Sequence, residues 1–223
     1  MFLIPSILCY TDVEIAKKIE YLHSHQFSFK KQLQNSTSGL TLHLDFVGKN
    51  FARDRGVLQS CRPEIVFEKL IQAFSKKELN VDVHLMSSAE DQLQDWQFFE
   101  KFQRPKAWNL SIFVDSNILV PWQIFFESKG YKIGVWMDLN QWSLVQSTET
   151  KKVVLMTVNA GKSGQVTTSS TKLEALNLIK MNPTKNIILD GGWGEKDYEL
   201  LSQNNLPHQK FVSGSSFWNN RLV

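Results

Sequence analysis

The chain has 223 residues and a formal net charge of +3 at pH 7, with 42% hydrophobic and 21% charged residues. This balance is that of an ordinary globular protein, and the small charge with scattered lysines argues against a nucleic-acid-binding role. Two cysteines, Cys9 and Cys61, are too few for a disulfide framework and fit a reducing compartment.

The apolar start of the chain predicts a strand. Met1-Phe2-Leu3-Ile4-Pro5 is short, lacks a basic flank and is interrupted by a proline, so it does not resemble a signal peptide. No apolar run approaches the roughly 18 residues that a membrane-spanning helix needs. We therefore expect a cytoplasmic protein.

Short apolar runs alternate with longer helical patterns along the rest of the chain, as in repeated βα units around a parallel sheet. A first strand at 2–8 is followed by a helix at 11–25, capped by Thr11, and by a polar connection at 27–39. Further strands are predicted at 40–46, 80–86, 110–115, 132–138, 152–158, 186–190 and 209–213. Further helices are predicted at 63–76, 88–102, 118–128, 141–146, 172–181 and 195–203.

Eight strands with seven intervening helices predict a (β/α)8 TIM barrel, with residues 1–223 as a single domain. A full eighth helix is not expected, because only ten residues follow the last strand. These ten include the apolar Phe217, Trp218, Leu222 and Val223, which could fold back onto the barrel or be covered by another subunit. Since large bare apolar patches are unusual on soluble monomers, we expect a homo-oligomer, with a dimer as first choice.

Polar residues stand at the carboxyl ends of several predicted strands, where barrel enzymes carry their chemistry. Because strand side chains alternate, His43 and Asp45 share one face. His84 and Asp190 lie at the ends of two other strands, and Ser6 lies near the end of the first. One such pair alone would be read as a satisfied core histidine beside a turn aspartate. Two imidazoles and two carboxylates together favour a divalent ion such as Zn²⁺, Fe²⁺, Mn²⁺ or Co²⁺, with a position open for substrate.

Small, glycine-containing loops follow the last three predicted strands: Gly161-Lys162-Ser163-Gly164, Gly191-Gly192 and Gly214-Ser215-Ser216. Glycine lets backbone N–H groups approach an anion closely, and barrels often bind phosphate at the loops after strands seven and eight. The alternative is three ordinary turns. Gly161-Lys162-Ser163 also resembles the end of a nucleotide-binding P-loop, but that motif needs a glycine where this chain has Met156.

Taken in order, these motifs resemble the ribulose-phosphate 3-epimerase family over nearly the whole chain, from Pro5 to about Phe217. The matching runs are Pro5-Ser6-Ile7-Leu8, His43-Leu44-Asp45, Asp82-Val83-His84-Leu85-Met86, Met156-Thr157-Val158-Asn159-Ala160-Gly161, Asp190-Gly191-Gly192 and Gly214-Ser215. The resemblance implies a barrel of the ribulose-phosphate-binding type. It also implies an enzyme that interconverts ribulose 5-phosphate and xylulose 5-phosphate.

The resemblance implies a role for each matching residue. The expected ligands of a divalent metal ion (Zn, Fe, Mn or Co) are His43, Asp45, His84 and Asp190, and the expected proton-transferring residues are Asp45 and Asp190. The expected substrate-binding residues are Ser6, Met86, Met156, Gly161, Gly164, Gly191, Gly192, Gly214 and Ser215, of which Gly191, Gly192, Gly214 and Ser215 match phosphate contacts. Lys162 stands where the family usually has an aromatic residue and is a candidate phosphate contact.

The implied chemistry is a proton exchange at C3 of the ketose. One carboxylate on each side of the sugar chain would remove or deliver a proton, each alternating between base and acid. The intermediate would be a cis-enediolate, whose charge a metal ion stabilises as a Lewis acid. The methionines would form an apolar wall that keeps water away.

The chain departs from the family pattern at several places, among them the Asp-Gly turn after the second strand, the length of the connection before that strand, the last helix and the following three sites. Val47 replaces a methionine of the pocket wall, Asp138-Leu139 replaces an Asn-Pro pair, and the loop Ala160–Gln165 differs from the usual Pro-Gly-Phe-Gly-Gly-Gln. The alternatives left open are epimerisation of allulose 6-phosphate, a degenerate barrel that binds sugar phosphate without turnover, and a decarboxylase or aldolase barrel. The sequence has no obvious lysine at a strand end that could form a Schiff base, which makes the aldolase hypothesis less favoured.

Overall fold

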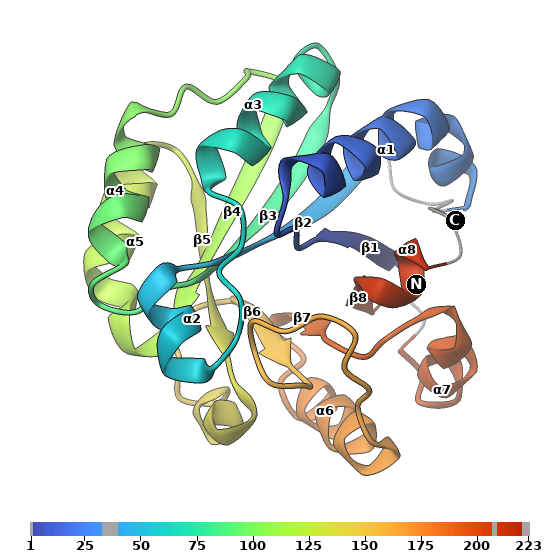
Figure 1. Ribbon diagram of the computed structural model, residues 1–223. Coiled ribbons are helices and arrows are strands. Elements are labelled where there is room, and N and C mark those ends of the chain that lie inside the picture. The colour runs from blue at the N-terminus through green and yellow to red at the C-terminus, as the bar shows by residue number, and fades with distance from the viewer. Residues whose placement is uncertain (1, 33–39, 207–208, 220–223) are drawn as a thin grey trace.

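Eight parallel strands close into a barrel in the computed structural model, which describes residues 2–32, 40–206 and 209–219 (Figure 1). Each strand pairs with the next in the chain, and β8 pairs with β1. The strands are β1 (Phe2–Ile7), β2 (Leu40–Val47), β3 (Leu79–Met86), β4 (Trp108–Asp115), β5 (Lys132–Met137), β6 (Lys152–Met156), β7 (Asn186–Asp190) and β8 (Lys210–Ser213). The (β/α)8 barrel predicted from the sequence is confirmed.

Helices surround the barrel on its outer side (Figure 1). They are α1 (Asp12–Gln32), α2 (Lys49–Arg55), α3 (Pro63–Phe74), α4 (Gln92–Lys101), α5 (Leu119–Ser128), α6 (Ser169–Met181), α7 (Tyr198–Gln203) and α8 (Ser215–Trp218), with the 3₁₀ helices η1 (Ser116–Ile118), η2 (Leu139–Leu144) and η3 (Glu195–Asp197). Within the described residues, no helix combines the length and apolarity that crossing a membrane requires.

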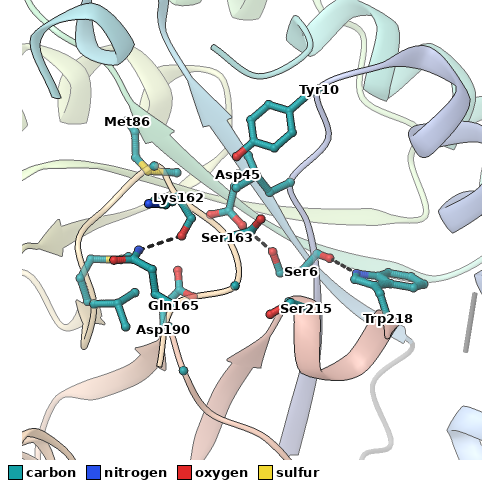
Figure 2. A pocket seen from close by; sticks show the side chains of 18 of the residues that line it. Ser6, Tyr10, Asp45, Met86, Lys162, Ser163, Gln165, Asp190, Ser215 and Trp218 are labelled. Atoms are coloured by element: carbon teal, nitrogen blue, oxygen red, sulfur yellow. Dashed lines mark hydrogen bonds between the residues drawn. The ribbon is translucent and has the colours of Figure 1, made fainter. Parts of the chain in front are cut away.

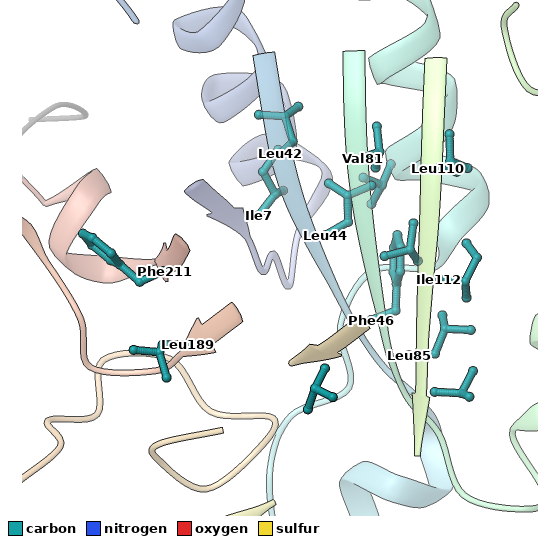
Figure 3. Close-up of a cluster of buried hydrophobic side chains, with 14 of the residues drawn as sticks. Ile7, Leu42, Leu44, Phe46, Val81, Leu85, Leu110, Ile112, Leu189 and Phe211 are labelled. Atoms are coloured by element: carbon teal, nitrogen blue, oxygen red, sulfur yellow. The ribbon is translucent and has the colours of Figure 1, made fainter. Parts of the chain in front are cut away.

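Alternation along the strands separates two apolar layers. On β2, Leu42, Leu44 and Phe46 are buried in the layer between the strands and the helices (Figure 3). Side chains of the opposite parity belong to the barrel interior, where Ile4, Phe113, Trp136, Val154, Ile188 and Val212 form a second buried cluster. His43 and Asp45 have this inward parity, so the apolar alternation of β2 also directs its two polar residues toward the barrel axis.

Several helices begin a few residues away from their predicted starts, such as α4 at Gln92 and α6 at Ser169, and the helix predicted at 141–146 is the 3₁₀ helix η2. Two segments differ more. Helix α1 continues to Gln32, so the first part of the connection predicted at 27–39 is helical, and residues 33–39 lie outside the described part of the chain. Helix α2 was not predicted. It buries only Phe51 and Ala52, and its start is held from outside by Asp91, which accepts hydrogen bonds from the backbone N–H groups of Asn50 (3.0 Å) and Phe51 (2.8 Å). Periodicity within a short stretch of sequence cannot predict a contact with a carboxylate so far along the chain.

The described residues after β8 form one helical turn, α8. Phe217 and Trp218 are buried against the rest of the chain, and the Trp218 indole N–H donates to the Ser6 carbonyl at 2.6 Å. Leu222 and Val223 lie outside the described residues. The described part of the tail therefore packs onto its own barrel, and the oligomeric state stays a prediction.

Candidate active site

Two histidines and two aspartates meet at the carboxyl ends of β2, β3 and β7. In the sheet register Asp45 lies beside His84, which brings the inward side chains of neighbouring strands together. His84 Nδ1 is 3.0 Å from Asp45 Oδ1 and 3.5 Å from Asp190 Oδ2. His43 Nε2 is 3.3 Å from Asp45 Oδ1 and 3.5 Å from Asp190 Oδ2. All four ligand atoms lie within 4.8 Å of one another; we call these four residues the tetrad.

The tetrad is an electrostatically coupled buried group. Burial disfavours ionisation of Asp45, but the attraction of His43 and hydrogen bonds from both imidazoles outweigh it and hold the pKa of Asp45 well below its ordinary value. Burial would likewise lower the pKa of His43, yet the neighbouring Asp45 and Asp190 raise it well above the ordinary value. The two carboxylates are therefore favoured as anions, and the site requires compensating positive charge.

The tetrad fits a divalent transition-metal ion. Ligand atoms held about 2.1 Å from one ion are separated by roughly 3 to 3.5 Å around it, and the four histidine–aspartate separations of 3.0–3.5 Å match that spacing. Two imidazole nitrogens and two carboxylate oxygens suit Zn²⁺, Fe²⁺, Mn²⁺ or Co²⁺. Among the described residues, the outer ring nitrogens His43 Nδ1 and His84 Nε2 have no hydrogen-bond partner, so the polar interactions of both rings are directed into the tetrad.

Residues around the tetrad orient its members. The Ser6 hydroxyl donates to Asp45 Oδ2 at 2.5 Å, which leaves Oδ1 facing the histidines. The Trp136 ring lies 5.2 Å from the His84 ring, centroid to centroid, and its indole N–H donates to the Leu85 carbonyl at 2.9 Å. The tetrad is therefore fixed on one side by a hydrogen bond and on another by a buried aromatic wall.

A cavity of about 270 Å³ is lined by the two aspartates of the tetrad (Figure 2). Asp45 and Asp190 reach it from different strands, while His43 and His84 are fully buried and do not line it. The structure brings every predicted substrate-binding residue to this one cavity, together with Lys162: its lining includes Ser6, Met86, Met156, Gly161, Gly164, Gly191, Gly192, Gly214 and Ser215.

Two of the lining glycines are required by the backbone. Gly191 and Gly192 have φ values of +95° and +73°, in the left-handed region that favours glycine. A Cβ at Gly191 would lie 2.2 Å from Val158 Cγ2, and one at Gly192 would lie 2.7 Å from the Thr167 backbone nitrogen. The loop after β7 thus approaches the loop after β6 so closely that only glycine fits, leaving bare backbone at the cavity edge.

The positions that depart from the family pattern have contacts of their own. Val47 is buried in the barrel-interior cluster, near the place that a Cβ on Gly161 would occupy. Asp138 forms an ion pair with Arg55 of α2 at 2.5 Å and caps η2 through the Leu139 N–H at 2.9 Å. These contacts tie the loops after β2 and β5 together at the barrel mouth.

Several lining residues were not anticipated. They are Leu8, Tyr10, Glu14, Lys18, Val158, Ser163, Gln165, Trp218 and Asn219. Gln165 fastens the loop after β6 by donating to the carbonyls of Asn159 (2.6 Å) and Lys162 (2.8 Å). Ser163 and Gln165 stood in a loop already marked as unusual, but Lys18 and Trp218 carried no local signal, because helix packing alone places them here.

A closed parallel barrel with a candidate metal tetrad and a polar cavity at its carboxyl-terminal mouth is an arrangement that metal-assisted TIM-barrel enzymes use. Comparison with known proteins narrows this class. The model of the "Ribulose-phosphate 3 epimerase family" matches residues 22–218, and the chain belongs to that family. The family supports an epimerase that acts on a carbohydrate, and its known use of divalent metals agrees with the tetrad.

Of two other comparisons, one found no match and one bears on the fold alone. No curated protein matches the chain. Among solved structures, the chain is similar to the YdjI aldolase from Escherichia coli K12, with a TM-score of 0.51 and 11% sequence identity over 98% of this chain and 76% of that one. At this identity the similarity concerns the barrel and carries no statement about chemistry.

Proposed function

We propose that the protein is a metal-dependent epimerase that interconverts D-ribulose 5-phosphate and D-xylulose 5-phosphate. The observation that carries this proposal is the pair of carboxylates, Asp45 from β2 and Asp190 from β7, which enter one cavity beside a metal-binding tetrad. Epimerisation at C3 requires a proton to leave one face of the carbon and another to arrive on the opposite face. Two carboxylates from different strands supply the two proton carriers.

The residues of the cavity divide this work among them. With the sugar chain between them, one carboxylate accepts the C3 proton. The other, after taking up a proton from solvent, gives it to the opposite face. The reverse reaction exchanges the two roles. The Ser6 hydroxyl, which donates to Asp45 Oδ2, keeps that carboxylate in one orientation. Met86 and Met156 line the cavity and limit the access of water to the reacting carbon.

His43, Asp45, His84 and Asp190 would hold the metal ion in this proposal. When bound, a divalent ion supplies Lewis-acid stabilisation of the negative charge that develops on the substrate oxygens. The phosphate group would lie at the other end of the cavity, against the exposed backbone of Gly191-Gly192 and Gly214-Ser215, where N–H groups can donate to an anion. We place the whole reaction within one barrel domain, residues 1–223.

A coupled assay with ribulose 5-phosphate, with allulose 6-phosphate run beside it, tests the proposal. Turnover of the pentulose phosphate is the expected result, and preference for the six-carbon substrate would make the protein a hexulose-phosphate 3-epimerase. Binding of both without turnover, in protein loaded with Zn²⁺, Mn²⁺, Co²⁺ or Fe²⁺, would contradict an enzymatic role and leave a sugar-phosphate-binding barrel.

Lys162 is expected to contribute modestly to phosphate binding. Its side chain is exposed at the cavity rim, between the left-handed Gly161 and Gly164. Lys162→Ala should raise KM for the phosphorylated ketose several-fold with little change in kcat, because the cation contacts only the unreacting end of the substrate. Steady-state kinetics of the variant provide the measurement. An unchanged KM would mean that Lys162 is a solvent-exposed residue that does not contact the phosphate.

Two further expectations complete the proposal. We expect a homo-oligomer, with a dimer as first choice, and light scattering behind size exclusion at micromolar concentration is the direct test. A clean monomer that is destabilised by deletion of residues 217–223 would favour the self-packed tail and contradict the dimer.

A cytoplasmic location fits the two free cysteines and is best checked by fractionation.

A further inference from the structure

Lys18 is a lysine built into the wall of the cavity. It extends from α1 and is half-buried, and its ammonium group donates to the Leu8 carbonyl at 2.8 Å. The same Nζ lies 5.5 Å from the centre of the Trp218 ring. Leu8, Trp218 and Lys18 all line the cavity. A side-chain hydrogen bond also joins Lys18 to Cys9. An ammonium group carries three donors, so these two hydrogen bonds and the aromatic contact hold its position and leave one donor for a ligand.

The surroundings of Lys18 place it at the end of the cavity formed by α8. Trp218 donates to the Ser6 carbonyl, and a Cβ on Gly214 would lie 3.8 Å from the Ser6 side chain. Lys18, Trp218, Ser6 and Gly214 therefore form a continuous run of neighbours. This run connects the lysine to the loop after β8, which exposes the backbone of Gly214-Ser215 to the cavity.

The distribution of charge around the cavity also favours an anion near Lys18. The acidic groups of its floor, Asp45 and Asp190, are favoured as anions and would repel a phosphate dianion placed beside them. Glu14, the other carboxylate in the lining, is occupied by the N–H groups of Tyr10 (2.8 Å) and Thr11 (3.1 Å) at the start of α1. Among the described lining residues the cationic side chains are Lys18 and Lys162, and of these Lys18 is the one with fixed contacts.

We propose that Lys18 is a substrate-binding residue, the principal cation that receives the phosphate group of the ketose at the α8 end of the cavity. This inference rests on the proposed function for the identity of the ketose, but the anion site itself does not. A cation held in place loses less side-chain entropy on binding than a free one. Lys18 therefore contributes more to phosphate affinity than the exposed Lys162.

The test compares Lys18→Met with Lys18→Arg and with the matched control Lys17→Met. Methionine keeps the length of the side chain over Trp218 but removes the charge, and Lys17 is the exposed neighbour on the same helix. Calorimetry gives the Kd for inorganic phosphate, and steady-state kinetics give KM and kcat for ribulose 5-phosphate. Thermal unfolding of each variant reports any loss of fold.

Lys18→Met is expected to weaken phosphate binding and to raise KM by about tenfold or more, the effect of losing one charge-assisted hydrogen bond. We expect kcat to change less than about twofold, and Lys18→Arg to recover most of the affinity. Lys17→Met should behave as the wild type. An unchanged phosphate Kd in a folded Lys18→Met protein would overturn the proposal, as would equal losses in the Met and Arg variants with lowered thermal stability.

These outcomes separate the anion site from the reaction. If the wild type turns over no ketose phosphate but its phosphate affinity depends on the Lys18 charge, the anion site stands and the proposed epimerase function fails. If the wild type is an active epimerase and Lys18→Met leaves its KM and phosphate Kd unchanged, the proposed function stands and the proposed anion site is wrong.

Discussion

Asp45→Asn and Asp190→Asn are each expected to abolish epimerisation while the barrel stays folded. Each carboxylate is proposed as both a proton carrier and a metal ligand, so its amide can neither accept the C3 proton nor return one. Loss of a general acid–base group alone costs about 10²–10⁴ in rate, and disturbance of the metal adds to that loss. The measurement is kcat for ribulose 5-phosphate, with circular dichroism to verify the fold.

Asp115→Asn is the matched control for these two variants. Asp115 also ends a barrel strand, β4, but it caps η1 by accepting from the Asn117 N–H at 2.8 Å and is not among the cavity-lining residues described above. Its replacement should leave kcat unchanged. Metal content measured in all three variants distinguishes loss of proton transfer from loss of the ion. Near-wild-type turnover in either tetrad variant would rule out the two-carboxylate mechanism.

The purified protein is expected to contain about one divalent transition ion per chain. Chelation should remove both the ion and the activity, and Zn²⁺, Fe²⁺, Mn²⁺ or Co²⁺ should restore them. The double variant His43→Ala with His84→Ala should bind no ion, because it leaves two carboxylates without nitrogen ligands. Elemental analysis of the dialysed proteins measures metal content independently of activity.

A second pair of histidines provides the control for the metal experiment. His23 and His25 are exposed on α1, so replacing both with alanine removes the same number of imidazoles from the chain and should leave one ion bound. Full activity in protein verified to be metal-free would contradict the assignment of the tetrad. Because the tetrad histidines are fully buried, thermal unfolding must accompany the analysis, and a folded but metal-free double variant is the expected result.

Local pattern in the sequence was sufficient for the elements and for the direction of the key side chains. The apolar alternation Leu42, Leu44, Phe46 predicts a strand and forces His43 and Asp45 onto its opposite face, which is where they lie. Thr11 and Glu14 exchange hydrogen bonds at the start of α1, so the start of this helix could also be predicted from the sequence. These features depend only on residues a few positions apart, and the chain encodes such spacing directly.

Only the tertiary structure determined which residues from distant parts of the chain are in contact. The helix α2 begins where Asp91, some forty positions away, accepts from Asn50 and Phe51. Barrel closure brings Asp190 of β7 to within 3.5 Å of both histidines, and packing of α1 against the last turn places Lys18 over Trp218. Such contacts join residues far apart in the sequence and depend on strand register and helix packing, which no local period specifies. The sequence alone therefore determined the barrel and which way its polar residues point, whereas only the folded chain determined the distances that make them a site.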